Sequence, residues 1–132
     1  MQRLKTRAQF QAVLAGSIVA KTPHFALHRN TLDVKTASAL SGGLVLFTQQ
    51  AMWIGAMVPK RWAKRAVTRN AIKRQIYTVS ADFSCQYPQA AFVVRLRSSF
   101  PRAEFVSAVS DQLKQAVRAE VQALMQAGAK AA

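Results

Sequence analysis

Apolar residues recur along the chain with two different spacings, and these spacings predict where helices and strands lie. The helical spacing, with an apolar side chain every three or four residues, is found at 6–15, at 65–81 and from 98 towards the C-terminus. Short apolar or alternating runs, which are typical of strands, are found at 24–28, 44–47, 53–58 and 91–97. The order α-β-β-β-α-β-α predicts an α+β fold in which helices pack on one face of a small mixed β-sheet.

Polar and turn-forming residues set the boundaries of these elements. Thr6 and Gln9 have the spacing of a capping box, which starts the first helix, and Gly16 ends it. The residues from Ser17 to Pro23 are predicted to form a connector. Residues 30–43 are polar and rich in small side chains, which predicts a loop. The added residues from about Thr36 to Gln50 suggest an extra strand or a longer hairpin, for which the sequence suggests no function.

One segment between the last two predicted strands is strongly basic. Its cations are Lys60, Arg61, Lys64, Arg65, Arg69, Lys73 and Arg74. No Asp or Glu occurs between Asp33 and Asp82, so the cluster has no neighbouring acid to neutralise it. Like charges four residues apart destabilise a free helix, which favours a role for this segment in binding a polyanion.

The same segment has an apolar side when it is drawn as a helix. Ile72, Ile76 and Val79 return every three or four residues, whereas Arg65, Arg69 and Lys73 lie on a separate face. We therefore expect the isoleucine side to be buried and the arginine side to be exposed to phosphates. An ordinary solvated basic face is the alternative interpretation.

Composition narrows the class of partner. The 132 residues carry 19 Lys and Arg against five Asp and Glu, a net charge of +14. Nucleic acid is the favoured partner, ahead of an acidic membrane surface and an acidic protein. Cys85 is the only cysteine, so no internal disulfide can form, which is consistent with a reducing cytoplasm. We expect a single domain over 1–126 and a frayed tail at 127–132.

The sequence offers no set of catalytic side chains. Its five carboxylates are scattered and give no paired general acid and base. No Cys or His cluster has the spacing of a zinc site, and there is no glycine-rich phosphate loop. His24 and His28 have no second metal ligand nearby in sequence, so metal binding by either is disfavoured.

The basic segment resembles the signature segment of the bacterial ribonuclease P protein subunit family. That family shows a basic pair, a short spacer, further basic residues, then Arg-Asn-Arg, an apolar residue and Lys-Arg. The matching positions are Lys60, Arg61, Lys64, Arg65, Arg69, Asn70, Lys73 and Arg74. Ala71 departs from the second arginine of Arg-Asn-Arg, and Tyr77-Thr78 departs from a common Arg-Glu pair. The resemblance extends over about Arg3 to Glu120, although its flanks match only in pattern.

The resemblance implies a fold and a function. The fold would contain a left-handed β-α-β crossover. The chain would be the RNA-binding subunit of ribonuclease P, the ribonucleoprotein that removes the 5′ leader from precursor tRNA. Catalysis would belong to the RNA subunit, which would also hold most of the Mg²⁺. The matching residues of the basic segment would hold that RNA, and Phe10, Phe25 and Arg97 would line a cleft for the leader. The protein would be cytoplasmic, with no membrane contact and no evident protein partner.

Four alternative interpretations remain from the sequence. A ribosomal or other structural RNA-binding protein would share the charge and the fold class. A membrane-surface protein would need a cleanly amphipathic lysine-rich helix, which the segment from Arg65 does not supply. Phe10 could be an ordinary core residue, and the arginines on one face of strand 91–97 could simply suppress edge aggregation.

Overall fold

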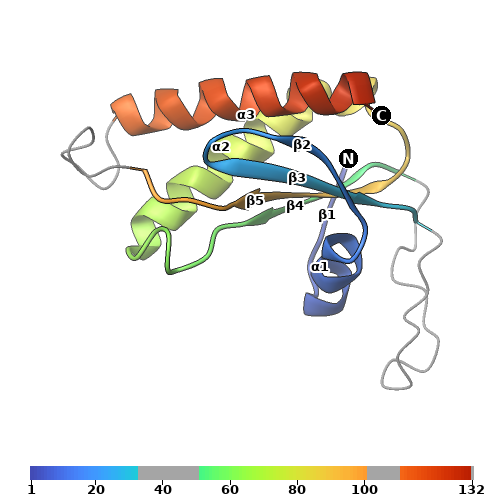
Figure 1. The fold of residues 1–132 in the computed structure, drawn as a ribbon, viewed down its shortest axis with the longest axis horizontal. Helices are drawn as coiled ribbons and strands as arrows, with labels where there is room; N and C mark the ends of the chain where they lie inside the picture. The colour runs from blue at the N-terminus through green and yellow to red at the C-terminus, as the bar shows by residue number, and fades with distance from the viewer. Residues whose placement is uncertain (33–50, 101–110, 132) are drawn as a thin grey trace.

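A five-stranded sheet with helices on both sides makes up the fold (Figure 1). The computed structural model describes residues 1–32, 51–100 and 111–131. The elements are β1 (Gln2–Arg3), α1 (Arg7–Leu14), β2 (Ser17–Lys21), β3 (Phe25–Asn30), β4 (Trp53–Met57), α2 (Ala66–Phe83), the 3-10 turn η2 (Ser84–Gln86), β5 (Ala91–Leu96) and α3 (Asp111–Ala131). The predicted strand at 44–47, the stretch 36–50 and residues 101–110, which would hold the expected first turns of the last helix, lie outside the described residues.

The strands are ordered β1-β4-β5-β3-β2, with both parallel and antiparallel neighbours. β4 and β5 pair in parallel although α2 separates them in sequence, so the chain crosses over the sheet through that helix. β3 pairs antiparallel with β5 and with β2. This arrangement confirms the mixed sheet and the α+β class, while the left hand of the crossover stays a prediction.

The larger core lies between the sheet and the two long helices. Figure 1 shows α2 and α3 on the same side of the sheet. Alternate residues of β5 face them, and Phe92, Val94 and Leu96 are fully buried there, as their alternation predicts. The predicted apolar residues of the helices meet this face. They are Ile72, Ile76 and Val79 of α2 and Leu113, Val117 and Leu124 of α3.

A smaller cluster lies on the opposite face, under α1. Val13 of α1 packs with Leu4, Trp53 and Val93. The expectation that the helices pack on one face therefore holds for α2 and α3 and is wrong for α1. Eight residues are enough for this helix because the predicted capping box forms: the Thr6 side chain accepts from the Gln9 backbone N–H, and the Gln9 side chain accepts from the Thr6 backbone N–H.

The strands β1 and β2 are both at the edges of the sheet, and the sequence analysis predicted neither of them. β2 lies where a connector was expected, and it forms the edge of the sheet beside β3. β1 adds two residues to the other edge, parallel to β4. Neither shows a clear apolar alternation, because an edge strand is held mainly by backbone hydrogen bonds to one neighbour. Between α1 and α2 the described residues contain the three strands β2, β3 and β4. The number of strands predicted there is also three, but the prediction did not include β2 and instead placed a strand at 44–47.

The C-terminal residues continue α3 rather than fraying. The expected tail at 127–132 is wrong as far as Ala131, where the described helix ends. Gly128 is buried, and a Cβ atom there would collide with the side chains of Leu27 and Tyr87. The Tyr87 hydroxyl donates to the Met125 carbonyl oxygen, and burial raises the pKa of this tyrosine to about 12. These contacts fix the last turns of α3 on the sheet.

Candidate nucleic-acid interface

The basic segment consists of a turn and the first part of α2, from Ala66 to Arg74. The turn follows β4, and the carbonyl oxygen of Pro59 accepts from the backbone N–H groups of Trp62 and Ala63. Ala63 is buried, and Trp62 packs against the main core, so the turn is anchored from inside. The remaining side chains of the turn project outward, and Lys60, Arg61 and Lys64 are all exposed.

Helix α2 separates its apolar side from its basic side, as the sequence predicts. Ile72 and Ile76 are buried in the main core, at 2% and 0% exposure. Arg65, Asn70 and Arg74 are exposed on the outer side of the helix. Lys73 and Arg69 are half-buried at its flank. The helix is thus held by one side, which leaves the other free to meet a ligand without unfolding.

Arg69 has a structural role that the spacing did not predict. Its Nη1 donates to the carbonyl oxygens of Ala63 at 3.0 Å and Lys64 at 2.8 Å. The expectation that Arg69 is simply exposed is therefore wrong. The guanidinium ties the turn to the first turn of α2, because both carbonyls belong to residues that precede the helix. Three further N–H groups are left on the guanidinium for other acceptors.

The electrostatics of this surface favour an anion. Within the described part of the chain, no carboxylate lies within ion-pair distance of a cation of the basic segment. Arg65 is the N-cap residue of α2, and no acidic side chain lies in the first turn. The dipole of the helix N-terminus therefore adds positive potential to that of the side chains. Arg61, above the Trp62 ring at 5.4 Å, is a further cation of this surface.

Both departures from the family motif have a local explanation in the packing. Ala71 is 8% exposed, so this position of α2 faces the protein interior and not solvent. Tyr77 lies one turn after Lys73, and its hydroxyl accepts a hydrogen bond from the backbone N–H of Ala56 at 3.2 Å. In this chain both positions serve the packing of α2 onto the sheet.

The predicted cleft residues divide between the two faces of the sheet. Phe10 projects from α1, is half-buried, and packs so closely over β4 that a Cβ at Gly55 would overlap its ring. Phe25 is fully buried on the other face, in the core under α3. The expectation that Phe25 lines a cleft with Phe10 is therefore wrong, because residues that alternate along β3 point to opposite faces. The residues of β3 on the face of α1 are Ala26, His28 and Asn30.

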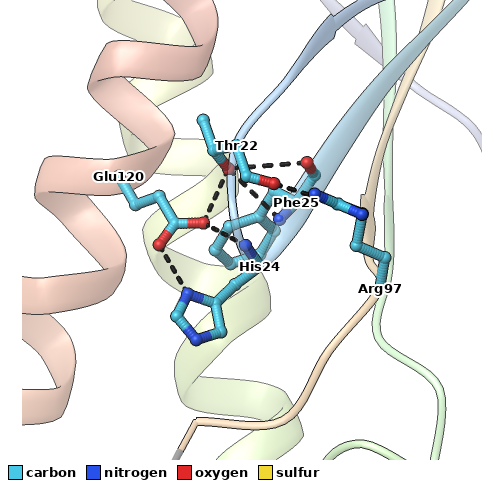
Figure 2. A network of polar contacts seen from close by, with 5 residues as sticks. All are labelled: Thr22, His24, Phe25, Arg97 and Glu120. Carbon is cyan, nitrogen blue, oxygen red and sulfur yellow. Dashed lines mark hydrogen bonds and ion pairs between the residues drawn. The ribbon is translucent and has the colours of Figure 1, made fainter.

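Arg97 lies just beyond β5, beside the turn that joins β2 to β3. It is exposed, and its Nε donates to the carbonyl oxygen of Thr22 at 2.9 Å. Figure 2 shows this turn held from its other side by Glu120 of α3. The carboxylate accepts from the Thr22 hydroxyl at 2.6 Å and the His24 backbone N–H at 2.7 Å, and it contacts His24 Nδ1 at 2.7 Å. The turn that supports Arg97 is thus fixed to α3.

A histidine and an arginine meet on the face of the sheet that carries α1, and the sequence analysis missed this pair. Arg95 Nε lies 3.1 Å from Nε2 of His28, across the β3–β5 pairing. His28 is buried, and its Nδ1 has no hydrogen-bond partner among the described residues. Burial, and then the charges of Arg95 and Lys21, lower the pKa of His28. The register of the two strands, which no spacing along the chain reveals, brings the pair together.

Other features of the described residues lie apart from this surface. A cavity of about 520 Å³ is lined by Gln86, Gln126, Ala129 and Lys130, which include none of the predicted site residues. In the described ranges, no three His, Cys, Asp or Glu side chains gather where they could hold a metal ion. The same ranges contain no helix that is long and apolar enough to span a membrane.

Comparison with known proteins gives consistent matches. The family model described as Ribonuclease P matches residues 1–124. Two curated proteins named Ribonuclease P protein component, from Bordetella parapertussis and Bordetella bronchiseptica, are each 39% identical over 70 residues. Those alignments cover 53% of this chain and 53% of each relative, so the match spans about half the length of these relatives.

Solved structures extend the similarity of fold to nearly the whole chain. A Staphylococcus aureus RNase P protein aligns with a TM-score of 0.64 and 18% identity, over 96% of this chain and 94% of that one. An RNase P protein from Thermotoga maritima aligns with a TM-score of 0.61 and 17% identity, over 96% of both chains. At these identities the alignments support the fold, while the family follows from the sequence match.

Proposed function

This chain belongs to the ribonuclease P protein family, and we propose that it is the RNA-binding protein subunit of the ribonuclease P ribonucleoprotein. Its role would be to assist the removal of the 5′ leader from precursor tRNA. One observation supports this most strongly. The cations of the basic segment lie on a turn and helix whose opposite side is buried, with no carboxylate within ion-pair distance among the described residues.

This arrangement is suited to an RNA backbone. Each phosphate neutralised by Lys or Arg releases condensed counterions, so a surface of several cations binds tightly and with strong salt dependence. The fixed turn and helix keep the cations in place before binding, which lowers the entropic cost of association. The residues proposed to hold the RNA subunit are Lys60, Arg61, Lys64, Arg65, Arg69, Asn70, Lys73 and Arg74.

Cleavage itself would be carried out by the RNA subunit, which would bind the Mg²⁺ that the reaction needs. The donor groups of the described residues do not fit a metal centre of this chain, because they form no cluster of three ligands. What the protein supplies is positive charge and a rigid shape.

The leader of the precursor tRNA would meet the face of the sheet that carries α1. Phe10 of α1 and Arg97 beyond β5 stay proposed contacts there, whereas Phe25 does not. The half-buried ring of Phe10 leaves part of its surface free for a base to stack on. The protein would act in the cytoplasm, where precursor tRNA is processed.

The alternative is a ribosomal or other structural RNA-binding protein, and the identity of the bound RNA separates the two. The tagged chain should be purified from its source cells at moderate salt, and the co-purifying RNA should be sequenced. A charge-reduced variant, Lys60→Ala with Arg74→Ala, serves as the matched control. Enrichment of the ribonuclease P RNA with wild type over the control is expected. Enrichment of ribosomal RNA alone would overturn the proposal.

A further inference from the structure

The guanidinium of Arg3 lies over the aromatic ring of Tyr77, with its Cζ 4.1 Å from the ring centroid. The contact joins β1 to α2. β1 pairs in parallel with β4, and Arg3 lies opposite Ile54, whose side chain is in the core under α2. The pairing therefore directs the side chain of Arg3 to the side of the sheet that α2 covers.

The hydroxyl of Tyr77 is held by a backbone N–H group of β4. β1 ends after Arg3, and the last backbone bond to β4 runs from Leu4 N–H to the Ile54 carbonyl oxygen. The next N–H of β4 on that edge belongs to Ala56, and it donates to the Tyr77 hydroxyl at 3.2 Å. Tyr77 thus replaces the missing strand partner, and its ring becomes a fixed platform at the edge of the sheet.

The platform continues the basic flank of α2. Tyr77 follows Lys73 by one helical turn and Arg69 by two, so the three side chains share a flank of the helix. Arg3 adds a cation to the end of this row although it comes from the other end of the sequence. The guanidinium of Arg3 contacts an aromatic ring and not a carboxylate. In the described ranges, no acidic side chain lies within ion-pair distance of Arg3.

A guanidinium stacked on a ring keeps its donor edge free. The planar face contacts the aromatic surface, while the N–H groups at the edge of the plane can form two parallel hydrogen bonds to a phosphate. Stacking also restricts a long side chain that would otherwise lose rotamer freedom on binding. Arg3 is exposed to solvent, so a phosphate can reach this edge.

We propose that Arg3, held on Tyr77, is a phosphate-binding site that extends the basic surface of α2 across the sheet edge to the N-terminal strand. The site binds the sugar-phosphate backbone of the RNA subunit and so rests on the proposed function. Tyr77 is a positioning residue that supports the cation and does not itself contact RNA.

The test compares four variants with wild type and one control. Arg3→Ala removes the charge, and Arg3→Lys keeps it without the planar fork. Tyr77→Leu removes the ring and the hydroxyl, whereas Tyr77→Phe removes only the hydroxyl that accepts from Ala56. Lys130→Ala removes one charge in the last turn of α3, away from the basic segment. The dissociation constant for the RNA subunit is measured over a series of salt concentrations, together with the melting temperature.

Arg3→Ala should weaken binding severalfold and reduce the slope of log K against log salt by about 0.7–0.9, the value for one lost phosphate contact. Arg3→Lys and Tyr77→Leu should weaken binding with little change in slope, because the charge is kept but its placement is lost. The folded molecules of Tyr77→Phe should bind the RNA subunit with the wild-type dissociation constant, because the ring that supports Arg3 is kept. Lys130→Ala should leave the slope close to that of wild type.

Two results would overturn the inference alone. One is a steep wild-type slope that Arg3→Ala leaves unchanged, with or without a lower melting temperature, since the stack would then be structural only. The other is Arg3→Lys binding as wild type does, since stacked geometry would then be irrelevant. If wild type binds the RNA subunit no better than an unrelated RNA of equal length, the proposed function fails and the inference with it.

Discussion

Nη1 of Arg69 lies 2.8 Å from the carbonyl oxygen of Lys64, so a cation of the proposed RNA surface also holds the turn that carries its neighbours. Arg74, by contrast, is exposed on the same helix, and its guanidinium has no ion pair or hydrogen bond among the described residues. Substitution of each arginine can therefore distinguish a contribution to folding from a contribution to RNA binding.

Arg69→Ala is expected to lower the free energy of unfolding by about 1–3 kcal/mol, because hydrogen bonds from a charged donor are lost. Arg74→Ala should change it by less than about 0.5 kcal/mol, as for most exposed sites. Both should weaken binding to the RNA subunit. Urea unfolding and filter binding on the same preparations would check this, and equal stability of the two variants would contradict the structural role of Arg69.

Ile72→Ala tests the opposite side of α2. The side chain is 2% exposed in the main core, so its truncation should cost about 2–5 kcal/mol of stability. The slope of log K against log salt should stay at the wild-type value for the folded fraction, since no phosphate contact is removed. A harmless Ile72→Ala, together with complete unfolding by Arg69→Ala, would mean that the two sides of the helix are assigned the wrong way round.

Phe10→Ala separates base stacking from packing. Removal of a stacked base is worth roughly 1–3 kcal/mol, so a substrate with a long leader should lose more affinity than mature tRNA. The contact with Gly55 predicts some loss of stability as well. Leu14→Ala is the matched control, because Leu14 packs against the same small cluster. If both variants lower the melting temperature and neither discriminates between the substrates, Phe10 belongs to the core alone.

His28 should make stability depend on pH. Burial and the charges of Arg95 and Lys21 lower its pKa in the folded protein, so the unfolded chain binds the proton more readily. Stability should therefore fall as pH drops below the unfolded value of about 6.5 and towards the lowered pKa. His28→Gln should remove this part of the pH dependence. The melting temperatures of both proteins between about pH 5 and 8 would show it, and identical profiles would exclude His28 as the cause.

The sequence predicts the local features of this protein well. The capping box at Thr6, the buried isoleucines of α2 and the alternating faces of β5 all follow from patterns within one element. The basic surface follows from composition, because no acid is close enough in sequence to mask it. Each of these depends on neighbouring residues, which a single sequence displays directly.

Features that depend on pairing between distant segments are not predicted. β2 and β1 are edge strands with little apolar signal, and the position of α1 on the opposite face depends on how the chain enters the sheet. The side to which Phe25 points depends on the register of β3, which its short, weak alternation does not fix. The contacts from Arg69 to the turn and from Arg3 to Tyr77 depend on three-dimensional proximity.

The most direct test of the whole account is cleavage of a precursor tRNA at low Mg²⁺ by the RNA-free protein, by the RNA subunit, and by the two together. We expect the protein alone to be inactive at every Mg²⁺ concentration, the RNA alone to be weak at low Mg²⁺, and the mixture to cleave efficiently. Turnover by rigorously RNA-free protein, or no gain when the protein is added, would contradict the account.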